Sequence, residues 1–202
     1  MENGIAYAAT ETVMTGVTQE VYDFYYAWTN AQNDSELIYK IWYPGYHYTT
    51  YTSLTDGGMV VVEDIGCGAE KIVMSNIRGI DLPRGGSSGV IETYMVNGTI
   101  TSLNGNRSLN SILFHVKYLN ENSEVVDRCI VWFGCYFDNG KLIVDLTGLD
   151  DPIARASGMA YHSAGENAHL TTVMHEIYED NKDSFGINSA SGKGKGSRGG
   201  SK

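Results

Sequence analysis

The sequence predicts an α+β fold in which helices cover one face of a curved antiparallel sheet. Three observations support this prediction. Two short amphipathic helical segments come first, a series of apolar strands follows, and one more helical segment comes near the end. The strands are joined by only a few residues each, whereas a parallel crossover needs about a dozen or more. The 202 residues suit a single globular domain.

Two helices are expected in the first quarter of the chain. In TQEVYDFYYAWTNA (18–31), apolar side chains recur at positions i, i+3, i+4 and i+7, which places them on one face of a helix. Thr18 can accept the first-turn hydrogen bond that caps this helix. The second helix, SELIYKIW (35–42), has Asp34 or Ser35 as its cap, and the Pro-Gly pair that follows ends it.

The middle of the chain consists of predicted strands separated by turn residues. A hairpin is expected from YHYTTYTSL (46–54) and MVVVE (59–63), which a Thr-Asp-Gly-Gly turn joins. A short helix is expected across residues 68–78. Further strands are predicted at residues 90–96, 99–103, 108–119, 124–137 and 141–149. An Asp-Asn-Gly turn before the last strand is a strong hairpin signal, and an apolar stripe predicts a final helix at 167–180.

The strand at 124–137 carries apolar side chains on both faces, so both faces should be covered. The helices would cover one face, and the other is expected to meet a partner subunit in a homodimer. The predicted organisation is an N-terminal arm at 1–16, a main domain at 17–152, a C-terminal extension with its helix at 153–186, and a disordered Gly/Ser/Lys tail at 187–202.

Charge and composition exclude several classes of partner. The formal net charge is −10, and four basic residues in the segment 189–202, which has no acid, leave −14 on the rest of the chain. Such an acidic body repels phosphate backbones, so nucleic acid is not an expected partner. No apolar run approaches the roughly 20 residues that span a membrane, and no secretion signal is recognised at the start. Three cysteines, an odd number, favour reduced thiols and a cytoplasmic location.

Three segments carry a resemblance to a known superfamily: FYYAWTNAQNDSELIYKIWYPGYHYTTY, IETYMVNGTITSLNGNRSL and FDNGKLIVDLTGLDD. Together with the order of elements, they resemble the NTF2-like superfamily, and within it the SnoaL-like group, over about residues 17–152. The resemblance implies an NTF2-like cone whose cavity, between sheet and helices, holds a small hydrophobic or aromatic molecule. Enzymes of this superfamily include ketosteroid isomerase, polyketide cyclases and scytalone dehydratase, while many members are not catalytic.

Side chains suited to acid/base chemistry lie on the predicted strands and the first helix. His115, in the apolar strand ILFHVKY, can act as an acid or a base if a cavity shifts its pKa, as the resemblance to dehydratases implies. Tyr26 and Tyr48 could donate hydrogen bonds to an oxyanion or a carbonyl. Each of the three also suits a structural role in packing or at an interface. The expected ligand-binding residues are Tyr22, Trp28, Trp42, Tyr46, Tyr94, Asn97 and Trp132.

Two other sets of polar residues have to be weighed. Asp127 and Asp145 are acids within apolar strands, and each suits either a general base with a raised pKa or an ion pair. His162, His169, His175 and Glu176 suggest a metal site in and just before the last helix. Two helical ligands need a spacing of about three or four, however, and His169 and His175 are six apart. No metal or other cofactor is therefore expected.

The residues and the resemblance together predict a protein with an aromatic-lined cavity for a small hydrophobic or aromatic molecule. As an enzyme it would be a cofactor-free isomerase, cyclase or dehydratase. Two alternatives stay open: a non-catalytic ligand-binding or oligomerisation module of the same fold, and a methyltransferase that uses S-adenosylmethionine. The methyltransferase alternative rests on VVVEDIGCGAEKIVM (60–74), in which an acid and a Gly-x-Gly turn would separate a strand from a helix.

Overall fold

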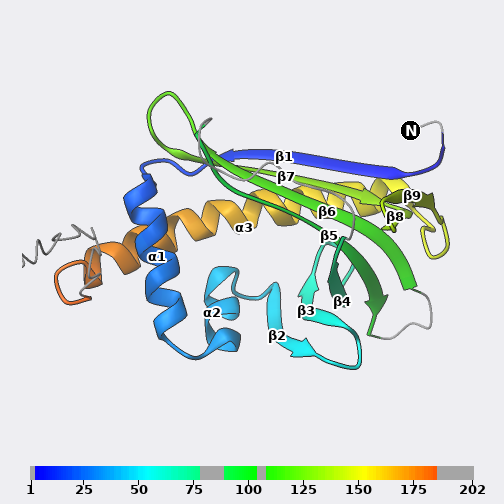
Figure 1. The fold of residues 1–202 in the computed structure, drawn as a ribbon, viewed down its shortest axis with the longest axis horizontal. Coiled ribbons are helices and arrows are strands. Elements are labelled where there is room, and N and C mark those ends of the chain that lie inside the picture. Colours follow the sequence, from blue (N-terminus) through cyan, green and yellow to red (C-terminus); the bar gives the residue numbers. More distant parts are fainter. Residues whose placement is uncertain (1–2, 78–88, 104–107, 186–202) are drawn as a thin grey trace, which may run out of the picture.

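The computed structural model describes residues 3–77, 89–103 and 108–185, so the predicted tail at 187–202 lies outside the described residues. Seven strands form one antiparallel sheet in the order β1-β7-β6-β5-β4-β3-β2, and β8 and β9 form a separate ribbon (Figure 1). The strands are β1 (Ala6–Val13), β2 (His47–Ser53), β3 (Gly58–Asp64), β4 (Ala69–Asn76), β5 (Val90–Ser102), β6 (Ser108–Leu119), β7 (Val125–Phe133), β8 (Cys135–Asp138) and β9 (Lys141–Val144). The helices are α1 (Gln19–Ala31), α2 (Ser35–Trp42) and α3 (Pro152–Asn181).

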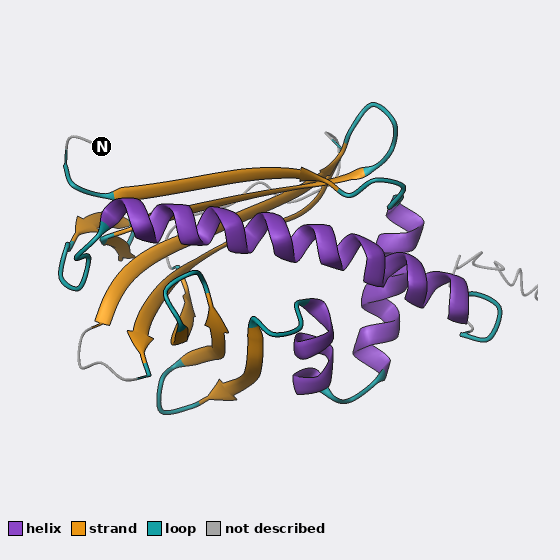
Figure 2. Ribbon diagram, turned by 180° about the vertical axis from the view of Figure 1, so that it is seen from behind, coloured by secondary structure: helices purple, strands orange, loops and turns teal. Residues whose placement is uncertain are grey.

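The helices pack beside the long strands and the short strand β2. Helix α3 runs along the length of the sheet, and α1 and α2 lie next to each other near the C-terminal end of α3 (Figures 1 and 2). One buried cluster surrounds Val61 and Phe133, and a second surrounds Tyr25 and Leu170. The predicted α+β class with an antiparallel sheet is confirmed.

Residues 1–16, predicted as an arm, include β1, which pairs along its whole length with β7. Among the described helices, none has both the length and the apolar character to cross a lipid bilayer.

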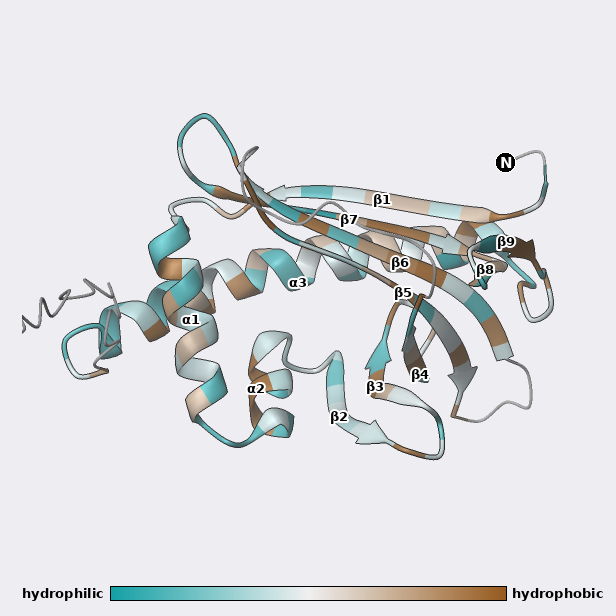
Figure 3. Cartoon of the chain, in the orientation of Figure 1, coloured by the Kyte–Doolittle hydropathy of each residue, from teal (hydrophilic) through white to brown (hydrophobic). Residues whose placement is uncertain are grey.

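The ribbon β8–β9 folds back over the sheet of its own chain. Gly134 interrupts the strand predicted at 124–137, because its φ is +89° and a Cβ there would lie 2.8 Å from Leu146 Cδ2. After this turn, Asn97 makes two 2.8 Å hydrogen bonds with the backbone of Phe137. The ribbon, whose apolar character is visible in Figure 3, thus takes part of the surface for which the sequence predicts a partner subunit.

A short helix is predicted across residues 68–78, but residues 69–76 form strand β4 instead, and residue 78 lies outside the described residues. Asp64 explains the turn before it, because its Oδ1 accepts hydrogen bonds from the backbone N–H groups of Gly66 at 2.8 Å and Gly68 at 3.0 Å. Both glycines have positive φ, +92° and +88°. The Gly-x-Gly segment is therefore the turn of the antiparallel β3–β4 hairpin, not the strand-to-helix turn that a cofactor-binding motif requires. The methyltransferase alternative is wrong for this reason.

Helix α3 has 30 residues and begins well before the predicted 167–180. Its first half is rich in small residues and has no apolar stripe, so periodicity does not reveal it. The signal lies at its start, where Asp151 Oδ1 caps the helix by accepting a 2.9 Å hydrogen bond from the backbone, and Pro152 occupies the first turn. The strands predicted at 90–96 and 99–103 similarly form one continuous strand, β5.

Gly66 lies where the β3–β4 turn meets α3, and a Cβ on it would lie 2.4 Å from Gly158 Cα. We expect Gly66→Ala to lower the free energy of unfolding by roughly 2–5 kcal/mol, because a left-handed backbone costs about 1–2 kcal/mol and overpacking about 1–3 kcal/mol. Gly68→Ala is the matched control, since a Cβ there has nothing within 4 Å and only the backbone cost applies. Urea denaturation measures both changes, and equal losses would contradict the close packing.

A candidate metal centre in an apolar cavity

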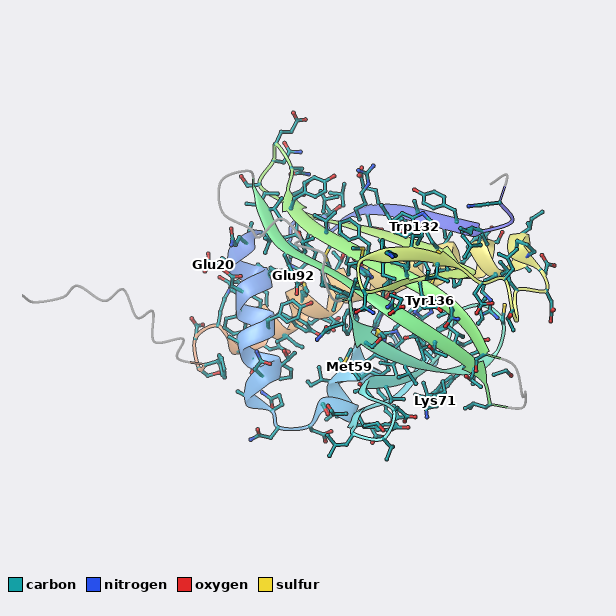
Figure 4. All side chains as sticks on the ribbon, turned by 45° about the vertical axis from the view of Figure 1, so that its right-hand side comes forward. Glu20, Met59, Lys71, Glu92, Trp132 and Tyr136 are labelled. Atoms are coloured by element: carbon teal, nitrogen blue, oxygen red, sulfur yellow. The ribbon has the colours of Figure 1, made fainter. Side chains whose placement is uncertain are left out.

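A cavity of about 740 Å³ is enclosed by the three helices and strands β2 to β6. Much of its wall is apolar, and Met59 of β3, labelled in Figure 4, contributes to it. Other apolar residues of the wall are Ile38, Trp42, Val61, Met74, Leu113 and Met159. This volume falls in the range of about 300–1,000 Å³ that is typical of sites for small organic molecules.

Four metal-ligand side chains meet at one side of this cavity. His47, Glu63 and His162 each offer one ligand atom, and these three atoms lie within 4.8 Å of one another. The Nε2 atoms of the two histidines are 3.4 Å apart. Glu166 completes the group, because its carboxylate oxygens lie 3.9 Å from His47 Nε2 and 3.8 Å from His162 Nε2.

Hydrogen bonds outside the cluster fix the orientation of both imidazole rings. His47 Nδ1 donates to the backbone carbonyl of Tyr39 at 3.1 Å, and His162 Nδ1 donates to the carbonyl of Asp64 at 2.8 Å. A carbonyl can only accept, so Nδ1 carries a proton in each ring and Nε2 is the nitrogen that remains to bind a metal. The Tyr39 hydroxyl also donates to the Glu63 carboxylate. Histidine ligands of metals are oriented in this way by a partner on the other ring nitrogen.

The electrostatics of the cluster favour a cation. Burial raises the pKa of Glu166 to about 8, and the neighbouring Glu63 adds to this shift. Burial also raises the pKa of Glu63. Burial, together with His162, lowers the pKa of His47 to about 3, so this ring is neutral at physiological pH. Two imidazoles and two carboxyl groups form a nitrogen and oxygen donor set that suits Zn²⁺ and other divalent transition metals. The residues present therefore fit a metal ion.

Secondary structure brings these four residues together. His47 and Glu63 are cross-strand partners in the β2–β3 hairpin. His162 and Glu166 are four residues apart on α3, so their side chains leave the helix on the same face. The centre therefore depends on the docking of α3 against the hairpin.

A glycine on α3 makes room for an aromatic pair beside the cluster. A Cβ on Gly165 would lie 2.1 Å from Tyr43 Oη. The Tyr43 ring packs edge-on against His162, with 5.4 Å between the ring centroids, and stacks on Tyr46 at 4.5 Å. Tyr46, one of the expected ligand-binding residues, thus supports the cluster from outside and does not line the cavity.

A second polar group lies in the cavity wall on β5 and β6. His115 lines the cavity, and the ring of Tyr94 stacks on it at a centroid distance of 4.9 Å. His115 Nδ1 lies 3.2 Å and 3.3 Å from the two carboxylate oxygens of the buried Asp127. Burial alone would lower the pKa of His115, but Cys129 and Asp127 outweigh it and raise the pKa to about 10. His115 is therefore cationic at neutral pH.

Four of the expected catalytic and ligand-binding residues line the cavity, namely Tyr26, Trp42, Tyr94 and His115, and so does His162, which the sequence offers as a metal ligand. The others lie outside the lining. Tyr48 is 38% exposed on β2, and the Tyr22 hydroxyl donates a 2.7 Å hydrogen bond to a carboxylate on β5. Trp28 is half-buried on α1.

Asn97 and Trp132 also lie away from the cavity. Asn97 bonds the β8 backbone, and Trp132, labelled in Figure 4, packs against Tyr7 at 5.8 Å. Asp145 binds the Thr147 backbone at 3.0 Å and the Asn110 side chain at 2.9 Å, so it serves a turn.

Sequence reasoning misses Glu63 and Glu166 and gives His47 no role of its own. It weighs His162 only with the two later histidines of α3, whose ring nitrogens bond backbone carbonyls of Ile41 and Thr15 instead. One local signal was present in the sequence, because His162 and Glu166 have the spacing of four that two ligands on a helix need.

Comparison with known proteins identifies the family. A family model described as the DAPG hydrolase PhiG domain matches residues 1–179. The chain is similar to phloretin hydrolase from Eubacterium ramulus, with 26% identity over 200 residues that cover 91% of this chain and 71% of that protein. A solved structure, the crystal structure of a conserved protein from Geobacillus kaustophilus, aligns with 87% of this chain and 96% of that one, at 12% identity and a TM-score of 0.38.

These findings correct two predictions. The resemblance to the NTF2-like superfamily and its SnoaL-like group is wrong, because a different family model covers most of the chain. The prediction of an isomerase, cyclase or dehydratase is wrong as well, because the family and the relative are named as hydrolases. The cause of both errors is that paired aromatic helices followed by an antiparallel meander suit more than one α+β family. The chain belongs to the DAPG hydrolase PhiG domain family.

Proposed function

We propose that this protein is a metal-dependent hydrolase that cleaves the carbon–carbon bond between a polyhydroxylated aromatic ring and a ketone carbonyl. The observation that carries this proposal is the buried cluster of His47, Glu63, His162 and Glu166 in the wall of a largely apolar cavity. Membership of a family named for a hydrolase and similarity to a phloretin hydrolase support it.

The substrate class follows from the chemistry of the relative's substrate. Phloretin contains no ester or amide, and its carbonyl is a ketone attached to a trihydroxylated benzene ring. Hydrolysis can therefore break only a carbon–carbon bond at that carbonyl. The water oxygen bonds to the carbonyl carbon, the bond from this carbon to the ring breaks, and the ring carbon keeps the electron pair and takes a proton. The products are a carboxylic acid and a polyhydroxybenzene.

The cluster and the cavity wall have different roles in the proposed reaction. A divalent metal held by His47, Glu63, His162 and Glu166 would act as a Lewis acid toward the ketone oxygen and lower the pKa of water. His115 holds a proton at neutral pH, so it is the group in the cavity wall that can give one to the ring carbon. The apolar walls hold the aromatic rings and exclude bulk water.

Incubation of the purified protein with phloretin in H₂¹⁸O tests the proposal. We expect mass spectrometry to find one ¹⁸O atom in the carboxylic acid and none in the polyhydroxybenzene. Treatment with a chelator should abolish the products, and added Zn²⁺ should restore them. A matched ketone without ring hydroxyls is the control, and it should not be cleaved because its ring carbon is a poor leaving group. Failure of the metal-loaded protein to hydrolyse phloretin and related acyl polyhydroxybenzenes would refute the proposal.

A further inference from the structure

A row of charged side chains lies beside the cavity wall, on the same face of the sheet as His115 and outside the metal cluster. Glu92 of β5, Lys117 of β6 and Asp127 of β7 are consecutive cross-strand partners. Lys117 and Asp127 are only 4% and 2% exposed. A buried charge is costly unless a partner compensates it. The partner of each charged side chain in this row therefore indicates its role.

Lys117 already has a partner of its own. Its Nζ lies 3.0 Å from Glu92 Oε2, and the same carboxylate accepts a 2.7 Å hydrogen bond from the Tyr22 hydroxyl. Glu92 lies beside α1, at the edge of the row (Figure 4). The Asp127 carboxylate instead faces the His115 ring. Its two oxygens lie 3.2 Å and 3.3 Å from His115 Nδ1.

We propose that Asp127 is a positioning residue, which holds His115 in one ring orientation with the proton on Nδ1 and leaves Nε2 to act on the substrate. This inference rests on the proposed function of the cavity. The Asp127 carboxylate contacts Nδ1 from β7, and Tyr94 stacks on the ring face with an interplanar angle of 14°. The side chain of Cys129, the cross-strand partner of His115, is a further hydrogen-bond neighbour of the ring. A carboxylate that orients a catalytic imidazole through Nδ1 is an established device in enzymes with other folds.

Titratable groups on the neighbouring elements face this part of the sheet. Asp127 and Cys129 of β7 and Glu92 of β5 interact with His115, whereas Lys117 of β6 interacts with Asp127. Across the cavity, the electrostatic neighbours are Glu63 of β3 and Glu166 of α3. Of these acids, only Asp127 is hydrogen-bonded to the ring among the contacts that the structure describes. Burial alone would raise the pKa of Asp127, but the hydrogen bond and charge of His115, with Lys117, lower it.

Asp127→Asn and Glu92→Gln make a matched pair, because each replaces one carboxylate beside Lys117 by an amide of nearly the same shape. In the zinc-loaded protein, ¹⁵N NMR of the imidazole rings reports which nitrogen of His115 is protonated. We expect both ring nitrogens of His115 to be protonated at neutral pH in wild type and Glu92→Gln, and the proton on Nδ1 to remain when Nε2 loses its proton at higher pH. In Asp127→Asn, the pKa of His115 should fall toward or below its ordinary value, and the Nδ1–H should lose its protection from exchange.

Steady-state kinetics should also distinguish Asp127→Asn from Glu92→Gln. For Asp127→Asn we expect kcat for phloretin to fall at least about tenfold with little change in KM. This loss is smaller than the whole contribution of acid–base catalysis, which is roughly 10²–10⁴-fold, because His115 itself is still present. The alkaline limb of its pH profile should move to lower pH, because the protonated ring is the active form. Glu92→Gln should lose much less.

The inference is overturned if Asp127→Asn keeps both the Nδ1–H signal and a kcat close to that of wild type. If the variant does not fold, the wild-type spectrum still decides, since a His115 ring without a protonated, exchange-protected Nδ1 would refute the assignment. If wild type hydrolyses no acyl polyhydroxybenzene, the proposed function is refuted independently of Asp127. The NMR comparison then tests by itself whether Asp127 orients the His115 ring.

Discussion

Replacement of His162 by alanine is expected to remove most of the bound divalent metal and, with it, the hydrolysis of phloretin. His162 is one of four ligands in the candidate centre, and its Nε2 lies 3.4 Å from that of His47. Loss of a residue that merely orients a ligand costs about 10–100-fold in metal affinity, so loss of a ligand should cost at least about 100-fold. Elemental analysis of the purified variant and competition with a chromogenic chelator measure the change.

The same helix supplies the control for this experiment. His175 is half-buried on α3 and is not part of the cluster, since its Nε2 lies 3.1 Å from the carbonyl oxygen of Thr15. His175→Ala should therefore keep the metal content and activity of the wild type. Full metal occupancy in His162→Ala would show that the four residues do not form the metal site.

Substitution of His115 by glutamine is expected to lower kcat by about 10²–10⁴-fold, because a glutamine amide cannot give up a proton as an imidazolium does. The metal content should stay unchanged, since His115 is not a member of the ligand cluster. Steady-state kinetics with phloretin and elemental analysis of the same sample distinguish this result from a loss of metal.

His169→Gln is the matched control for His115→Gln. His169 is half-buried on α3, and its Nε2 lies 3.2 Å from the carbonyl oxygen of Ile41, away from the residues that line the cavity. Its replacement should change kcat little. If His115→Gln retained the kcat of wild type, His115 would not be the proton donor. This result would leave the proposed metal site untouched.

Local signals predict much of the fold. The short turns require an antiparallel meander, and the apolar spacing locates α1, α2 and the second half of α3. The prediction is wrong at 68–78, where a carboxylate from Asp64 and two glycines with positive φ build a hairpin turn that has the appearance of a helix start. It is incomplete before residue 167, because small residues pack one side of α3 against Gly66 without producing an apolar stripe.

The candidate site is harder to predict, because tertiary packing assembles it. His115 and Trp42 are recognisable in the sequence, since a histidine in an apolar strand and a tryptophan at a helix end are unusual in themselves. His47 and Glu63 have no such mark and are brought together only by the register of β2 and β3. Their alignment with α3 depends on contacts between segments more than 90 positions apart, such as the 2.8 Å bond from His162 Nδ1 to the Asp64 carbonyl.

The distribution of the four ligands along the chain has a consequence for biosynthesis. His47 and His162 are 115 positions apart, so a bound ion would close a very long loop, which is where a metal cross-link stabilises a chain most. While the chain is still being made, the hairpin ligands leave the ribosome first and wait for their two partners on α3. All four ligands can hold the ion only after Glu166 has been made, and a nascent chain that stops before this residue has an incomplete centre.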